Sequence, residues 1–271
     1  MKYKLSILVV LYACHEDESK TLQSLNKCSV DERVKIIIWN NGPKEIITAG
    51  NYEVIQTIQN LPLSVIYNKF IESFDSERFV LFDHDSTIHQ EYIDILLKAC
   101  NEAIYLPVIY SNGEAIYPIY KDSFFSKKIT INDDCELITP KMLMSIASGL
   151  SISATLVAKF KLLYGNVFDE RFKFYGVDTS FFIRALKNNE RFIINSSLNH
   201  SLSRLEKESE QRTLFRKKER LIDACLIFKN YYSFGTLLRL VMFFKNNKAY
   251  VLANVSIVLR CIFSGKHPGI K

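Results

Sequence analysis

The sequence predicts an α/β protein with a mostly parallel central sheet flanked by helices, followed by a helical tail. Ser6–Tyr12 and Val34–Trp39 are continuous aliphatic runs, typical of parallel strands that are covered on both faces. Between them, His15–Lys27 has acids in its first turn and leucines on one helical face. A strand, a helix and a strand begin a right-handed βαβ unit. Phe79–Phe82 is a third short apolar strand.

The rest of the chain alternates in the same way. Periodicity and turn residues predict two strands that pair around Ser111-Asn112-Gly113, and a later strand that runs directly into a helix. The expected strands are Tyr105–Tyr110, Ala115–Tyr120, the start of Ser151–Phe160, and Phe192–Asn195. The expected helices are His15–Lys27, Glu91–Asn101, Lys141–Gly149, the end of Ser151–Phe160, Val177–Lys187, Leu214–Phe228 and the helical region Thr236–Phe263.

Composition excludes several classes of protein. The chain has 271 residues, 48% of them apolar, with 9 glycines and 6 prolines, so it is neither collagenous nor disordered. The six cysteines form no CxxC or Cys/His cluster, which argues against a zinc site and favours reduced thiols in the cytoplasm. Leu5–Cys14 is about half the length of a membrane span, so we interpret it as a buried strand rather than a leader.

Charge divides the chain into an expected catalytic domain, residues 1–203, and a tail, residues 204–271. The tail holds 14 Lys/Arg and 5 Asp/Glu, whereas the domain holds 21 and 24. Because basic residues alternate with apolar runs in the tail, an anionic membrane surface fits better than nucleic acid. Leu237–Phe244 and Tyr250–Phe263 are each too short to span a bilayer. A hairpin packed on the domain, or a homodimer interface, remains an alternative.

Three polar turns follow the predicted strands: Tyr12-Ala13, Asn40-Asn41-Gly42 and Asp83-His84-Asp85. Parallel α/β sheets bind ligands at the carboxyl ends of their strands, so a nucleotide could span all three turns. Tyr12 would stack on the base, and the asparagines would hydrogen-bond its edge. An ordinary turn at the asparagines and a packed aromatic at Tyr12 are the alternatives.

The acidic tripeptide indicates a metal site. Two neighbouring carboxylates repel each other unless a cation neutralises them, and Mg²⁺ or Mn²⁺ suits such oxygen ligands together with substrate phosphates. His200 follows the last predicted strand and would join the site if the fold brings it near Asp85. Asp178 follows Gly176 at the start of a predicted helix, where it serves either as a general base or as a helix cap.

Taken in order, these segments resemble family 2 glycosyltransferases of the GT-A fold, especially the rhamnosyltransferase-like branch of O-antigen, capsule and cell-wall synthesis. Ser6–Tyr12 is similar to the family's opening strand, and Asp83-His84-Asp85 occupies the place of its DxD motif. The other matching segments are Ile37–Gly42, Asn60–Pro62 with Asn68, Gly149–Ser151, Phe168–Phe172, Gly176–Asp178 with Arg184, and Asn199–Ser201.

The resemblance implies an inverting transfer of sugar from a dTDP- or UDP-sugar to a glycan or polyprenyl-diphosphate-linked acceptor. Asp178 would be the catalytic base. Donor-binding residues would be Leu11, Tyr12, Asn40, Asn41, Asn68, Asp83 and His84, and metal ligands would be Asp85, Asp83 and His200. The expected location is the inner face of the cytoplasmic membrane. dTDP-rhamnose is the first candidate donor, with galactosyl, galactofuranosyl and N-acetylhexosaminyl donors as alternatives.

Some positions depart from the family pattern. Asn40 stands where an Asp commonly contacts the base, and Val177 replaces the first acid of a Glu-Asp pair. A non-catalytic nucleotide-sugar-binding subunit is therefore the rival hypothesis. The Gln-x-x-Arg-Trp motif of processive synthases is missing, since the single Trp is Trp39.

Overall fold

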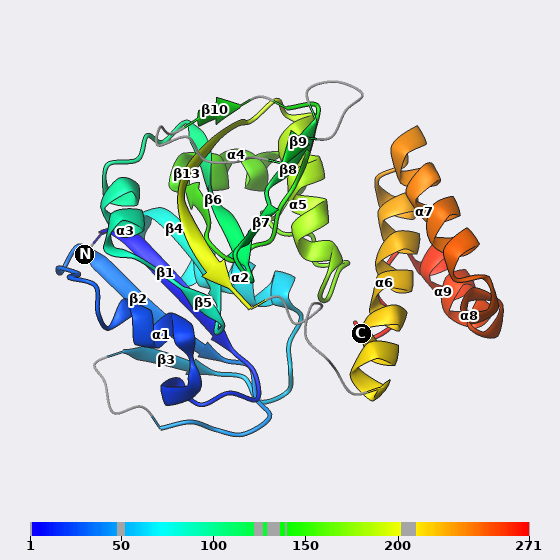
Figure 1. Cartoon of the computed structure of the whole chain (residues 1–271), viewed down its shortest axis with the longest axis horizontal. Helices are drawn as coiled ribbons and strands as arrows, with labels where there is room; N and C mark the ends of the chain where they lie inside the picture. Colours follow the sequence, from blue (N-terminus) through cyan, green and yellow to red (C-terminus); the bar gives the residue numbers. More distant parts are fainter. Residues whose placement is uncertain are drawn as a thin grey trace. The chain divides into compact units, whose positions relative to one another are not determined.

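The computed structural model describes residues 2–47, 52–121, 127–128, 136–138, 140–201 and 210–270 (Figure 1). Contacts divide the chain into two compact units. The first comprises Met1–Leu61, Ile66–Val167 and Arg184–Ser201, and the second comprises Pro62–Val65, Phe168–Ile183 and Leu202–Lys271. The expected boundary between residues 203 and 204 lies outside the described residues.

The first unit is built on a curled sheet (Figure 1). Its strand order is β10-β13-β6-β12-β4-β1-β2-β3, and β1, β2, β3 and β4 run parallel. Next to β4, β12 is antiparallel, so the sheet is mixed. The bounds are β1 Tyr3–Leu11, β2 Val34–Asn40, β3 Glu53–Gln56, β4 Ser76–Asp83, β6 Ala103–Ser111, β10 Glu136–Ile138, β12 Leu150–Ser153 and β13 Arg191–His200. Two short strands lie off this path, β5 Ser86–Thr87 paired with β13 and β7 Glu114–Tyr117 paired with β6.

Helices cover both faces of this sheet. On one face, α1 (Lys20–Leu25) and α3 (Gln90–Leu97) pack against buried aliphatic side chains of β1 and β4, and Tyr92 meets Phe82 edge to face. Strand side chains alternate between faces, so Phe79 points to the opposite side. There it contacts Phe70 of α2 (Leu63–Ser73), with α4 (Ala154–Tyr164) alongside. Burial on both faces explains why these strands are continuous apolar runs.

Some expected elements of the first unit differ from the structure. Ala115–Tyr120, expected as one strand, is divided at Pro118 between β7 and a second short strand, Ile119–Lys121. His15–Lys27 contains a 3₁₀ turn, Glu16–Glu18, and then α1, because Ser19 caps the new helix by accepting a bond from the Leu22 amide at 3.3 Å. The helix expected over Lys141–Gly149 is wrong. Met142–Met144 forms strand β11, which pairs with β8 (Ile119–Lys121), and β8 also pairs with β9 (Lys127–Lys128). Pairing between distant segments here overrides the local preference for a helix.

The second unit contains the helices of the tail. α6 (Glu210–Asn230) packs against α7 (Phe234–Asn246) and α9 (Val255–Ser264), which are joined by the short α8 (Lys248–Ala253) (Figure 1). The predicted helical region Thr236–Phe263 is thus interrupted at Asn247 and Asn254. No helix in the described ranges is long and apolar enough to cross a bilayer.

The segment Phe168–Phe172 is anchored to these tail helices. Asp169 is buried, accepts two bonds from the Arg171 guanidinium at 2.6 and 2.8 Å, and accepts a third from the Tyr231 hydroxyl at 2.5 Å. The Arg171 guanidinium also donates to Asn230 at 2.8 Å. A bidentate pair of this kind fixes the segment firmly. The family-like Phe-Asp-Glu-Arg-Phe stretch therefore has a packing role in this unit.

Gly176 begins α5 (Gly176–Lys187) in a crowded position. A Cβ atom there would lie 2.1 Å from the Phe172 ring and 2.4 Å from Asp223 Oδ1. These distances are far below contact, so only glycine fits without displacing a ring and a buried carboxylate. The absent side chain leaves room for packing within the unit.

Asp223 of α6 makes the stability of this unit sensitive to pH. Burial is the main cause that raises the pKa of its carboxyl from 3.8 to about 6, against the opposing charge of Arg239 at 3.1 Å. The folded state then binds more protons than the unfolded state between about pH 4 and 6, so the free energy of unfolding falls as pH rises through this window. The shift corresponds to roughly 3 kcal/mol.

We expect Asp223→Asn to remove most of this slope. Urea unfolding at about pH 4.5 and about pH 7 should show the variant gaining stability relative to wild type at the higher pH. Glu210→Gln, at an exposed position on the same helix, serves as the control. Parallel curves for Asp223→Asn and wild type would contradict the assignment.

Candidate metal and nucleotide site

The acidic tripeptide lies where β4 ends. Asp83 is the last residue of the strand, and the start of α1 holds the following turn. The Thr21 hydroxyl donates to the Asp83 carbonyl at 2.5 Å, and the Ser19 hydroxyl donates to the His84 carbonyl at 3.0 Å. Because these bonds use backbone carbonyls, they fix the turn while leaving the Asp83 and Asp85 carboxylates available.

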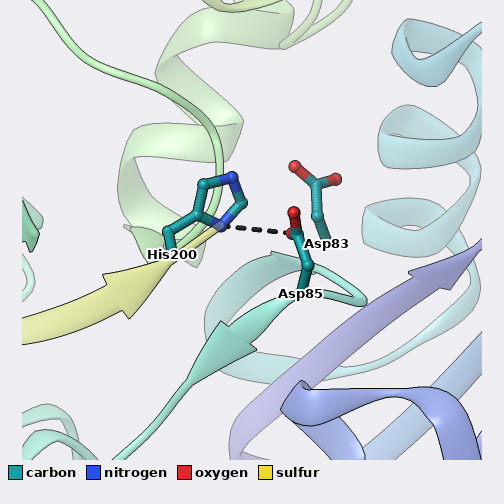
Figure 2. A group of neighbouring side chains, drawn as sticks. All are labelled: Asp83, Asp85 and His200. Atoms are coloured by element: carbon teal, nitrogen blue, oxygen red, sulfur yellow. Dashed lines mark ion pairs between the residues drawn. The ribbon is translucent and has the colours of Figure 1, made fainter. Parts of the chain in front are cut away.

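Strand pairing brings His200 to this turn. β13 ends at His200, which lies opposite Ser86 of β5, one residue after Asp85. His200 Nδ1 is 3.3 Å from Asp85 Oδ1 (Figure 2). The same nitrogen is 2.9 Å from the Ser86 hydroxyl. Ser86 in turn shares a hydrogen bond of 2.7 Å with Ser148, which also accepts from the Asp83 amide. The condition that makes His200 a candidate ligand, a position near Asp85, is therefore met in the structure.

Asp83, Asp85 and His200 fit a divalent cation. One ligand atom of each lies within 4.8 Å of the others. Among the described residues none gives the buried Asp85 Oδ1 a hydrogen bond. Burial raises the pKa of the Asp83 carboxyl, and the charge of Asp85 raises it further. A cation would relieve this repulsion, and two carboxylates with one imidazole suit Mg²⁺ or Mn²⁺.

Polar turns after β1 and β2 lie beside each other, as expected at one sheet edge. The Asn41 amide donates to the Leu11 carbonyl and the Ala13 amide donates to the Gly42 carbonyl, both at 2.8 Å. Gly42 adopts φ +90°, and a Cβ atom there would lie 2.6 Å from the Ile58 carbonyl oxygen. The turn therefore requires a glycine.

Both asparagine side chains of this turn are buried and hydrogen-bonded inside the protein. Asn40 donates to the Lys44 carbonyl and to Gln56, and accepts from the Gly42 amide. Asn41 donates to Asn60 and to the Leu61 carbonyl, and accepts from Thr57 and the Leu61 amide. These hydrogen bonds give both side chains a structural role. Contact of Asn40 or Asn41 with a nucleotide-sugar donor therefore remains a prediction.

The remaining residues predicted to bind the nucleotide-sugar donor differ in solvent accessibility. Tyr12 follows β1 and is 47% exposed, so its ring is available for stacking. Leu11 is fully buried and Asn68 is buried on α2. His84 is partly exposed, next to the carboxylates. Tyr12 is the member of this set that best suits direct contact with a planar base.

Asp178 belongs to the second unit. It lies in the first turn of α5 and is partly buried. Asp169, nine residues earlier, accepts bonds from Arg171 and Tyr231. The assignment of Asp178 as the general base stays a prediction.

Sequence reasoning missed the hydroxyl groups that support the site. Ser19, Thr21, Ser86 and Ser148 hold the turn or the imidazole, yet serine and threonine are common in any surface turn. Ser148 is 62 residues from Ser86 and 52 residues before His200. The sequence signal that could have identified them is a position next to the DxD motif. Among these four residues it applies only to Ser86.

The curled, mixed sheet with helices on both faces confirms the predicted fold class. Solved structures with this fold include two of Staphylococcus aureus TarS. One is 14% identical with a TM-score of 0.53, covering 84% of this chain and 44% of that chain. The other, TarS 1–349 in complex with UDP-GlcNAc, is 14% identical with a TM-score of 0.53, covering 91% of this chain and 73% of that chain.

These likenesses establish a shared fold. The chain spans less than half the length of the first TarS chain. No protein-family profile and no curated protein sequence matches this sequence.

Proposed function

We propose that this chain is a glycosyltransferase that uses a nucleotide-sugar donor and a divalent cation held by Asp83, Asp85 and His200. The observation that carries the proposal is the convergence of these side chains at the carboxyl end of β4. In α/β sheets this edge binds ligands. A solved structure with the same fold holds UDP-GlcNAc, which supports a nucleotide sugar as the ligand.

The cation would supply charge neutralisation for the departing nucleoside diphosphate. Asp85 and His200 would be its direct ligands, and Asp83 would share it or contact ribose and sugar hydroxyls. Tyr12 would stack on the base. Asp178 would remove the proton from an acceptor hydroxyl, which attacks the anomeric carbon in one displacement and inverts it.

We also propose a chemical class for the sugar donor and one for the acceptor. UDP-GlcNAc in the TarS complex favours a UDP-N-acetylhexosamine, one of the alternatives considered from the sequence, over the dTDP-rhamnose suggested by the family branch. The acceptor is a hydroxyl of a glycan, carried on a polyprenyl diphosphate, in the synthesis of a bacterial surface polysaccharide.

A donor screen tests the reaction class. Purified chain is incubated with UDP-GlcNAc, UDP-galactose, UDP-galactofuranose or dTDP-rhamnose, with Mn²⁺ or Mg²⁺, and released nucleoside diphosphate is measured. We expect release from one donor, supported by metal and abolished by EDTA. Metal-dependent donor binding without release or transfer to any glycan acceptor would instead indicate the non-catalytic binding subunit.

Ser86 offers a test of the metal site that does not depend on turnover. Its hydroxyl orients the His200 imidazole, and losing such a support typically weakens metal binding about 10- to 100-fold. We expect Ser86→Ala to lower Mn²⁺ affinity by that factor, measured by electron paramagnetic resonance of free Mn²⁺. Ser73→Ala, at the exposed end of α2, is the control. Unchanged affinity in Ser86→Ala would argue against His200 as a ligand.

A further inference from the structure

Large apolar side chains of α7, α8 and α9 are exposed in the described structure. On α7 they are Phe234, Leu238, Val241 and Met242, which recur at helical spacing and so share one face. On α9 they are Val255, Leu259 and Phe263, again on one face, and α8 adds Leu252. All eight are 43–82% exposed. We name these eight residues the tail stripes.

The tail stripes are not the faces that hold the helices together. Leu240, Val251 and Cys261 are buried, and α7 and α9 pack against α6 (Figure 1). Each helix thus has a buried side, and the tail stripes are separate from it. Exposed apolar side chains that recur along one face of a helix mark an interaction site.

The charged residues on α7, α8 and α9 are all basic. No acidic residue follows Asp223 in the sequence, whereas Arg239, Lys245, Lys248, Arg260, Lys266 and Lys271 all follow it. Lys245 and Lys248 are exposed at the junction of α7 and α8, and Arg260 is exposed on α9 beside Leu259. Arg239 is paired with Asp223, so it contributes less to this field.

We propose that the tail stripes dock on an anionic lipid surface. Apolar side chains would enter the boundary between headgroups and acyl chains, and the flanking lysines would reach the headgroup phosphates. A second copy of the same surface is a poorer partner, because it would set basic residues against basic residues with no acid to pair them. The proposal does not depend on the sugar or on the reaction.

Sedimentation of the full chain with vesicles tests the proposal. Binding to equimolar phosphatidylcholine and phosphatidylglycerol should exceed binding to phosphatidylcholine alone. Leu238→Gln with Met242→Gln, or Leu259→Gln with Phe263→Gln, should each lower partitioning roughly tenfold or more. Lys245→Glu with Lys248→Glu should have a comparable effect that diminishes at high salt.

Matched control variants distinguish the loss of the tail stripes from general effects of lost apolar surface or changed net charge. Leu162→Gln with Leu163→Gln removes two exposed leucines of α4, and Lys27→Glu with Lys187→Glu makes the same change of net charge elsewhere. Both controls should bind vesicles as wild type does, and thermal unfolding should confirm that every variant is folded. Wild-type binding by the stripe variants would overturn the proposal. So would a wild-type dimer in light scattering that the stripe variants disrupt, with no vesicle binding.

Discussion

Asp85→Asn is expected to reduce kcat about 10²- to 10³-fold, the range seen when a group that stabilises developing charge is removed. Asp85 Oδ1 has no hydrogen-bond donor among the described residues and lies 3.3 Å from His200 Nδ1. An amide of the same size keeps the shape of the turn but removes the anionic oxygen that a hard cation needs. The charge on a departing diphosphate would then lack its counterion.

Two measurements distinguish this effect from damage to the fold. Mn²⁺ binding without donor should weaken together with kcat, whereas thermal unfolding should stay close to wild type. Asp75→Asn, which makes the same change at an exposed residue ahead of β4, should leave both unchanged. If Asp85→Asn keeps metal-dependent nucleotide release, the assignment of Asp85 as a metal ligand is wrong.

Asp178→Asn should lower kcat roughly 10²- to 10⁴-fold, since general-base assistance contributes that much. Asparagine matches the shape of aspartate but cannot take a proton from an acceptor hydroxyl. KM for the donor and the affinity for Mn²⁺ should hardly change, because the metal is assigned to other residues. Asp85→Asn and Asp178→Asn therefore have different signatures, one in metal binding and one in the chemical step alone.

If Asp178 has only a structural role, the opposite effect on turnover is expected. An acid in the first turn of a helix stabilises it by about 0.3–1 kcal/mol through the helix dipole. If that is its whole role, Asp178→Asn will lower the melting temperature slightly and leave turnover intact. Glu170→Gln makes the same change of charge in the preceding acidic segment and should leave turnover near wild type. Near-normal transfer by Asp178→Asn would exclude it as the base.

Local sequence was enough to predict the strands that carry the site. A strand covered by helices on both faces is apolar at most positions, so Ser6–Tyr12, Val34–Trp39 and Phe79–Phe82 were recognisable from their composition. Charged residues that follow such a run are excluded from the core, so Asp83 and Asp85 could be placed at the end of the strand. Lys141–Gly149 shows the limit of this reasoning. Its strand depends on pairing with β8, which local periodicity does not report.

Tertiary structure decided which side chains meet. His200 reaches Asp85 because β13 pairs with β5, although the imidazole and Ser86 are 114 residues apart. The same packing turned Asn40 and Asn41 inward, where their buried side-chain amides hydrogen-bond to Lys44 and Leu61. The sequence by itself determined the DxD turn and its two carboxylates, since burial and charge repulsion act locally. The third ligand and its serine support depended on strand order, which is settled only when the whole sheet forms.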